Sequence, residues 1–449
     1  MKKLWSKEGK KLNKLVDEYC FSAGIEWDNS LVFYDVIGSI AHGKMLEKIG
    51  IITKNEFIKI KKYLVKIIYL HKNNQFKISQ EDEDVHTKVE NYLTEKLGDL
   101  GKKIHTGRSR NDQILVDLRL YSKGKIIKLA TTINQLIVVF AQFAKKYEFV
   151  PMPGYTHMQK AMPSSVGMWA GSFAEQLSDQ LESLKAVYKI NDQSPLGSGA
   201  AYGVSLPIDR ELTAKLLGFS KVQNNSLYCQ ASRVTIQLSI TQLLVQIMLC
   251  ASRFSQDLLL FTTSEFNFFE VDEEICTGSS IMPQKKNLDL MELVRGKTHT
   301  VIAKEQLMAA ILTSLPSGYN ADFGETKGPF MEALSITMNT LKALDITLKL
   351  IKPNKKNLSK ACTPEIYATH FAYKLVENGL PFRDAYLKIK NNLDKISSPD
   401  PVQFLKLSNH SGGTNNLKLD LIQKKSNEQK KYWENIEQKH KKVISFLLS

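Results

Sequence analysis

Serines and lysines are concentrated in one stretch of the chain that lacks the pattern of a helix or strand. The stretch reads TGSSIMPQKKN and runs from Thr277 to Asn287, with glycine and proline discouraging regular structure. A mobile loop of this kind can close over a ligand and expel water, which strengthens the attraction of Lys285 for developing negative charge. We expect Asn287 to cap the following helix, which contains Glu292. The alternative is a surface loop whose lysines only aid solubility.

A second polar segment, HTGRSRNDQ, occupies residues 105–113. Arg108 and Arg110 supply positive charge, and either Ser109 or Asn111 can cap the helix that follows. The unpaired amide groups and the dipole of a helix start attract carboxylates, so this segment is a candidate anion site. The alternative is an ordinary capped helix with solvated arginines.

The third segment, PGYTHMQKAMP, covers residues 153–163 and begins and ends with proline. The two prolines predict a turn between two helices. His157 lies among hydroxyl and amide side chains, and an imidazole exchanges a proton near neutral pH, so this residue is a candidate acid or base. The alternative is a histidine with a purely structural role.

Long apolar helices are predicted to position these segments. One stripe of apolar residues recurs at steps of three and four: Ile236, Ile240, Leu243, Ile247, Ala251, Phe254, Leu258 and Phe261. A second set, Leu238, Val245 and Leu249, lies away from that stripe. A helix that is apolar on more than one side must be buried on more than one side, which predicts the middle of a helix bundle.

The same periodicity predicts an all-α protein with few, short strands. Helices are expected near residues 30–49, 54–72, 111–147, 164–191, 288–313 and 330–351, with a shorter one after GLPFRDAY at 379–386. We expect three domains: an N-terminal helical domain (1–109), a central long-helix bundle (110–354) and a small C-terminal helical domain with a polar tail (355–449). The central helices are too long and apolar to be satisfied within one subunit, which predicts an oligomer.

Composition limits the cellular setting. The five cysteines are scattered without a C-x-x-C pair, which argues against a disulfide framework or a zinc cage and favours a reducing, cytoplasmic compartment. The basic start of the chain lacks the apolar core of a signal peptide. The apolar segment 236–261 is interrupted by glutamines, arginine and aspartate, so no membrane span is expected.

The formal net charge of +15 is compatible with nucleic acid or with an anionic small molecule as the partner. The basic runs at 352–360 and 423–431 lack interleaved aromatic residues, and no nucleic-acid-binding signature accompanies them. We therefore interpret the basic runs as solvated surface and expect no nucleic-acid partner.

The three polar segments together resemble a known family. GSSIMPQKKN is similar to the signature loop of the fumarase/aspartase superfamily, while TGRSRNDQ and GYTHMQKAMP resemble its argininosuccinate lyase branch. The resemblance extends through YDVIGSIAH (34–42), EDVHTKVE (83–90) and PLGSGAAYG (195–203) to LPFRDAY, and so covers most of the chain.

This resemblance implies cleavage of argininosuccinate into arginine and fumarate, without metal or cofactor. A proton leaves the carbon beside a carboxylate, and the resulting carbanion needs positive charge and hydrogen-bond donors, implied here to be Lys285 and Asn287. Ser279 and His157 are implied to be the proton-transfer pair, with Glu292 orienting the histidine. Which of the two is the base stays open.

The resemblance also implies a set of substrate-positioning residues and a shared site. The set comprises Ser109, Arg110, Asn111, Thr156, Gln159, Tyr319 and Lys327, which the family brings together from three subunits of a homotetramer. The chain departs from the family pattern at Gly24, Leu288 and Gly324, all outside the proton-transfer set. The alternatives are another fumarate-releasing lyase, acting on adenylosuccinate, aspartate or malate, or a crystallin-like structural protein with little activity.

Overall fold

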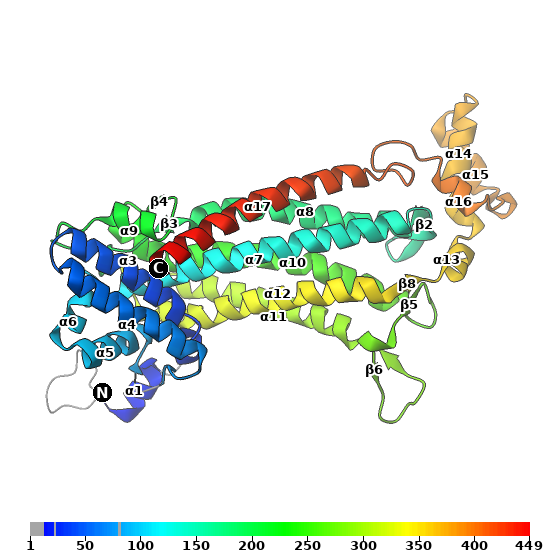
Figure 1. Cartoon of the computed structure of the whole chain (residues 1–449). Helices are drawn as coiled ribbons and strands as arrows, with labels where there is room; N and C mark the ends of the chain where they lie inside the picture. Colours follow the sequence, from blue (N-terminus) through cyan, green and yellow to red (C-terminus); the bar gives the residue numbers. More distant parts are fainter. Residues whose placement is uncertain (1–12, 22–23, 80–81) are drawn as a thin grey trace.

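The computed structural model describes residues 13–21, 24–79 and 82–449. Long helices lie side by side along most of its length (Figure 1), which confirms the expected all-α bundle. The bundle consists of α7 (Arg110–Lys146), α8 (Val166–Asn191), α10 (Ser226–Phe261), α11 (Asp289–Leu312) and α12 (Lys327–Leu350).

Helix α7 sets the length of the molecule. Its N-cap is Ser109, whose Oγ accepts a hydrogen bond from the Asn111 amide at 3.2 Å, while the Asp112 carboxylate accepts one from the Ser109 amide at 2.8 Å. The helix then runs for 37 residues. At 1.5 Å per residue this is about 55 Å, so α7 joins two distant ends of the bundle.

Helices α7 and α10 are each long and apolar enough to cross a membrane by length and composition alone. In the folded chain, 61% of the most apolar window of each helix is buried. Both pack against α8 and α12, as core helices do. The buried stripe of α10 includes Ile240 and Ile247, whereas Leu249 on its other side is 44% exposed. Within the single chain the second apolar set of α10 is not buried, so the prediction that α10 is buried on more than one side is not met by this chain alone.

The N-terminal helices form a cap over one end of the bundle, at the left of Figure 1. They are α1 (Lys14–Phe21), α2 (Ile25–Asp28), α3 (Val32–Lys48), α4 (Lys54–Lys72), α5 (Val85–Leu97), α6 (Asp99–Lys102) and the 3-10 helix η3 (Lys103–His105). α3 packs against both α4 and α7. Loops at this end of the bundle carry α9 (Arg210–Leu216) and the 3-10 helix η5 (Ala321–Thr326).

The described residues also form four small two-stranded sheets. β1 (Pro151–Thr156) pairs with β2 (Gln159–Ser165), β5 (Phe269–Val271) with β8 (Ile351–Pro353), and β6 (Thr277–Gly278) with β7 (Lys286–Asn287), all antiparallel. β3 (Gln193–Ser194) and β4 (Lys221–Val222) pair in parallel. The segment 153–163 turns between two helices as predicted, and it does so as part of the β1–β2 hairpin, which was not predicted.

The C-terminal segment first forms short helices at the far end of the bundle and then returns along it (Figure 1). The short helices are α13 (Lys355–Ala361), α14 (Ala368–Glu377), α15 (Phe382–Lys390) and α16 (Pro401–Leu405), with the 3-10 helices η6 (Pro364–Tyr367) and η7 (Leu393–Lys395). A further 3-10 helix, η4 (Glu273–Ile275), lies earlier in the chain, just before β6. The region expected to be a polar tail is the helix α17 (Leu419–Leu448), which packs on α7 and α8. Its buried Trp433 contacts Tyr188 edge to face.

Candidate active site

The start of α7 is held by acidic residues that precede α5. The Arg110 guanidinium donates to the Glu83 carboxylate at 2.5 and 3.2 Å and to the Thr87 hydroxyl at 2.5 Å. Burial by itself lowers the pKa of Arg110, but the Glu83 hydrogen bonds and the charge of Asp84 raise it on balance. Arg110 is therefore a fixed cation whose position depends on the first turn of α5.

Asp112 connects the same helix start to a neighbouring loop. Its second carboxylate oxygen accepts hydrogen bonds from the amides of Gly197 (2.9 Å) and Gly199 (3.1 Å). Both glycines have positive φ angles, 87° and 60°, which other residues rarely adopt. The PLGSGAAYG loop is thus anchored beside Ser109 and Asn111. Sequence reasoning gave Asp112 no role, although it belongs to the same motif, two residues after Arg110.

Lys327 and Tyr319 lie at this same end of the bundle. The Lys327 ammonium pairs with Asp28, and its side chain is only 12% exposed. Burial raises the pKa of Asp28, and Lys327 opposes this effect without cancelling it. The Tyr319 ring centroid is 5.4 Å from the guanidinium of the buried Arg233. A Cβ added at Gly24 would come within 3.0 Å of the Lys327 ammonium, so this departure from the family pattern borders the Lys327–Asp28 pair.

His157 lies at the opposite end of α7, in the two-residue turn of the β1–β2 hairpin. His157 and Met158 have φ angles of 52° and 61°, the left-handed values of a type I′ turn. Thr156, His157 and Gln159 are all exposed. A surface cavity of about 590 Å³ opens beside the hairpin, lined in part by Gln159, Tyr155 and Phe266.

The loop between β6 and β7 projects from the bundle at this second end (Figure 1). The Ser279 hydroxyl accepts hydrogen bonds from the amides of Ile281 (3.4 Å) and Met282 (3.1 Å). Lys286 pairs with Glu273 at 2.5 Å, whereas Lys285 has no carboxylate partner within the part of the chain that the structure describes. Lys285 is exposed. The loop therefore carries one compensated and one uncompensated lysine.

The start of α11 differs from the expectation. Its N-cap is Leu288, which makes no side-chain capping bond, so the prediction that Asn287 caps this helix is wrong. Asn287 instead donates to the Gly278 carbonyl at 3.5 Å, across the β6–β7 ladder. Leu288 is buried, which explains how the apolar residue is accommodated. Glu292 follows in the first turn of α11 and is exposed.

One chain thus divides the predicted site residues between two ends of the bundle. Ser109, Arg110, Asn111, Tyr319 and Lys327 lie at the end covered by the N-terminal helices; Thr156, His157, Gln159, Ser279, Lys285, Asn287 and Glu292 lie at the other. Among residues 13–21, 24–79 and 82–449, no hydrogen bond joins His157 to Ser279 or to Glu292 within the chain. A site that uses both sets requires more than one copy of the chain.

Comparison with known proteins places this arrangement in a family. Residues 13–303 match a family model described as lyase. The chain is 40% identical to argininosuccinate lyase of Thermotoga neapolitana, over 86% of this chain and 96% of that protein. It is 38% identical to argininosuccinate lyase of Phocaeicola vulgatus, over 94% of each chain.

Solved structures agree on the fold. EDDS lyase in complex with formate superposes with a TM-score of 0.83 at 21% identity, covering 98% of this chain and 95% of that one. Class II fumarase from Schistosoma mansoni superposes with a TM-score of 0.70 at 16% identity, covering 84% and 90%. These structures show the fold, and the family model and the sequence relatives establish that the chain belongs to the argininosuccinate lyase family.

Proposed function

We propose that this protein is a carbon–nitrogen lyase that cleaves argininosuccinate into arginine and fumarate, in a homotetramer whose active sites draw residues from three subunits. Two relatives named argininosuccinate lyase share 38–40% of the residues over most of the chain. One observation supports a site shared between subunits: the proposed site residues are divided between the two ends of α7, which spans 37 residues. No metal or cofactor is assigned to the reaction.

In this proposal, Lys285 stabilises the charge that develops when a proton leaves the carbon beside a carboxylate. The reaction places a second negative charge on that carboxylate, so a cation already in place lowers the barrier. Lys285 fits this role because it is exposed and free of a carboxylate partner in the described chain, while Lys286 beside it is neutralised by Glu273. Closure of the β6–β7 loop over the substrate would exclude water and strengthen the interaction.

His157 and Ser279 remain the proposed proton-transfer pair, with Glu292 orienting the imidazole. All three lie at the same end of the bundle, on the β1–β2 hairpin, the β6–β7 loop and the first turn of α11. We assign the pair but not the direction of proton transfer. Elimination then expels the guanidinium nitrogen of the arginine product, with Ser109, Arg110, Asn111, Thr156, Gln159, Asn287, Tyr319 and Lys327 positioning the substrate.

An uncovered stripe on α11 supports assembly with further copies. Leu293 and Leu307 are 56% and 47% exposed, and they belong to a set spaced alternately by three and four residues: Leu293, Gly296, Thr300, Ala303, Leu307 and Ala310, all exposed. This seven-residue repeat is the pattern of a helix–helix seam, and its small residues permit close approach. The face that packs on the chain's own core, formed by Met291, Val294, Thr298 and Val301, lies on the opposite side of α11. A second copy of this chain is therefore the occupant that we propose.

The cytoplasm is the proposed location. The five cysteines, all within the described residues, are free thiols in the structure. Cys229, Cys250 and Cys362 are buried, as thiols with a packing role commonly are. This pattern fits a reducing compartment. No nucleic-acid or membrane partner is proposed.

The function is tested by supplying argininosuccinate, adenylosuccinate, aspartate and malate in separate reactions and following the ultraviolet absorbance of fumarate. We expect a signal with argininosuccinate, together with stoichiometric arginine, and at most a weak signal with the other three. A dominant signal with another substrate would assign the chain to a different elimination within the superfamily. The absence of fumarate with all four would reject the enzymatic function and favour a structural protein.

A further inference from the structure

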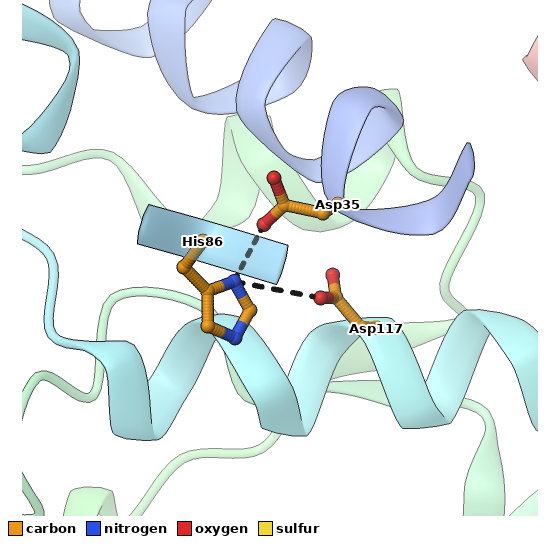
Figure 2. Close-up of side chains that lie close together, drawn as sticks. All are labelled: Asp35, His86 and Asp117. Carbon is orange, nitrogen blue, oxygen red and sulfur yellow. Dashed lines mark hydrogen bonds and ion pairs between the residues drawn. The ribbon is translucent and has the colours of Figure 1, made fainter. Parts of the chain in front are cut away.

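Three ionisable side chains are buried together where α3, α5 and α7 meet. Nδ1 of His86 lies 2.7 Å from a carboxylate oxygen of Asp35 and 3.8 Å from one of Asp117 (Figure 2). The three side chains are 5%, 2% and 1% exposed, respectively. Charges buried to this degree are costly unless they are paired. The short His86–Asp35 contact provides this pairing and so lowers the free-energy cost of burying the cluster.

Contacts and burial decide where the protons of this cluster lie. One oxygen of Asp35 and both oxygens of Asp117 have no hydrogen-bond partner in the part of the chain described by the structure. Burial by itself lowers the pKa of His86, but the charge and hydrogen bond of Asp35 raise it on balance. Burial and the nearby Asp35 also raise the pKa of Asp117 well above its usual range. We therefore assign an imidazolium to His86, hydrogen-bonded to Asp35, and a proton to Asp117.

The titratable groups that act on His86 are Asp35 on α3, Asp117 on α7, Asp84 at the start of α5, Asp28 at the end of α2, and His105 before α7, while Arg108 acts on Asp35 and Asp117. A bound divalent cation is a less favourable occupant than the imidazolium. The Arg108 guanidinium faces the same two aspartates, and a 2.7 Å separation leaves no space for an ion between Nδ1 and Asp35.

The first turn of α5 links this cluster to the candidate active site. Asp84 caps the helix by accepting hydrogen bonds from the Thr87 amide (2.7 Å) and the Thr87 hydroxyl (2.8 Å). The Thr87 hydroxyl and the Glu83 carboxylate both accept hydrogen bonds from Arg110. The short segment from Glu83 to Thr87 therefore carries both the buried His86 and the two groups that bind Arg110.

We propose that His86 is a positioning residue for substrate recognition, whose imidazolium fixes the first turn of α5 onto α3 and α7 so that Glu83 and Thr87 hold Arg110 in place. The inference rests on the proposed function, because Arg110 and its neighbours Ser109 and Asn111 are the residues assigned to substrate binding. His86 is not placed in contact with the substrate. Its loss should weaken binding more than it slows the chemical step.

The first test compares His86→Gln with wild type for argininosuccinate cleavage. We expect KM to rise about 10-fold while kcat changes by less than about 3-fold, because misplaced recognition residues mainly remove binding energy. The matched control is His71→Gln. His71 lies in α4 and is partly buried, and its imidazole bonds to the Phe76 carbonyl at 2.9 Å, away from Arg110, so this variant should leave KM unchanged.

The second test measures how KM depends on pH in proteins that remain folded. For wild type, KM should stay low while His86 is protonated and should rise as pH passes through its raised folded-state pKa. Asp35→Asn removes the largest charge that raises this pKa, so the rise in KM should move to lower pH. An unchanged KM in His86→Gln, or an unshifted KM profile in Asp35→Asn, would overturn the inference. A stoichiometric divalent metal that wild type retains and His86→Gln loses would also overturn it.

The third test measures thermal stability, which does not depend on enzymatic activity. It can therefore contradict this inference whether or not the proposed function is correct. A histidine whose folded-state pKa is raised contributes stability that is fully present below its unfolded pKa and is lost as pH rises through the folded value. The melting temperature of wild type should therefore exceed that of His86→Gln at acidic pH, and the difference should narrow at alkaline pH. If the difference in melting temperature between the two proteins did not change with pH, the assignment of an imidazolium to His86 would be contradicted. This outcome can be observed even in a protein without lyase activity.

Discussion

Two adjacent lysines in the β6–β7 loop differ in what surrounds them. Lys286 pairs with Glu273 at 2.5 Å, but Lys285 has no acidic partner in the described parts of the chain. An uncompensated cation contributes nothing to the stability of the single chain and is available to a substrate anion. Substituting each lysine separately therefore distinguishes a specific catalytic role of Lys285 from a general effect of positive charge in the loop.

We expect Lys285→Met to lower kcat by about 100- to 1,000-fold, as loss of one preorganised transition-state contact commonly does. Steady-state fumarate release measures this effect. Lys286→Met is the matched control and should retain activity within about 3-fold, because an exposed ion pair contributes little. Equal losses in the two variants would contradict the role of Lys285, as would dissociation of Lys285→Met into smaller species.

Residue types could be predicted from the sequence more easily than residue partners. A cap at Ser109 or Asn111 was predicted because both residue types before an apolar helix are local signals, and the structure has Ser109 in this role. The partners of Arg110 and Lys327 were not predicted, because Glu83 and Asp28 lie far from them along the chain and only the fold brings them together. Asn287 failed as a cap because the helix begins one residue later, after Leu288.

At the scale of elements, long helices were predictable and short strands were not. The helix predicted over 111–147 is α7 (Arg110–Lys146), and that over 164–191 is α8 (Val166–Asn191), because each has many turns of consistent apolar spacing. The β1–β2 hairpin has His157 and Met158 in its turn instead of the glycine or asparagine that normally signals one. α17 (Leu419–Leu448) was missed as a helix because its surface is largely polar, with few buried positions.

The exposed stripe of α11 gives a prediction about assembly. Ala303→Glu should dissociate the oligomer, because it would place a charge in a close helix–helix seam, and activity should fall with the loss of the tetramer. Size-exclusion chromatography with light scattering, followed by the fumarate assay, measures both. Ala303→Ser keeps the side chain small and should remain assembled. An Ala303→Glu protein that stays tetrameric and active would show that this stripe is not the seam.

At the scale of the whole molecule, the 37 residues of α7 separate the two groups of site residues. In the proposed site both groups are needed: the end near the N-terminal helices holds Arg110 and Lys327, and the other end holds His157 and Lys285. The sequence reveals the motifs but not their separation, because the distance depends on the direction of each helix in the bundle. The central claim is that chains placed side by side bring the two groups together.

Subunit mixing tests this claim most directly. Asn111→Ala and Lys285→Met each alter one group, and each variant alone should be nearly inactive. When the two are dissociated, mixed in equal amounts and reassembled, random assortment should restore about a quarter of the wild-type sites, because some sites receive both unaltered residues from different chains. If one chain supplied both residues to each site, mixed tetramers would contain no intact site, and an absence of recovered fumarate release despite proven mixing would contradict the account.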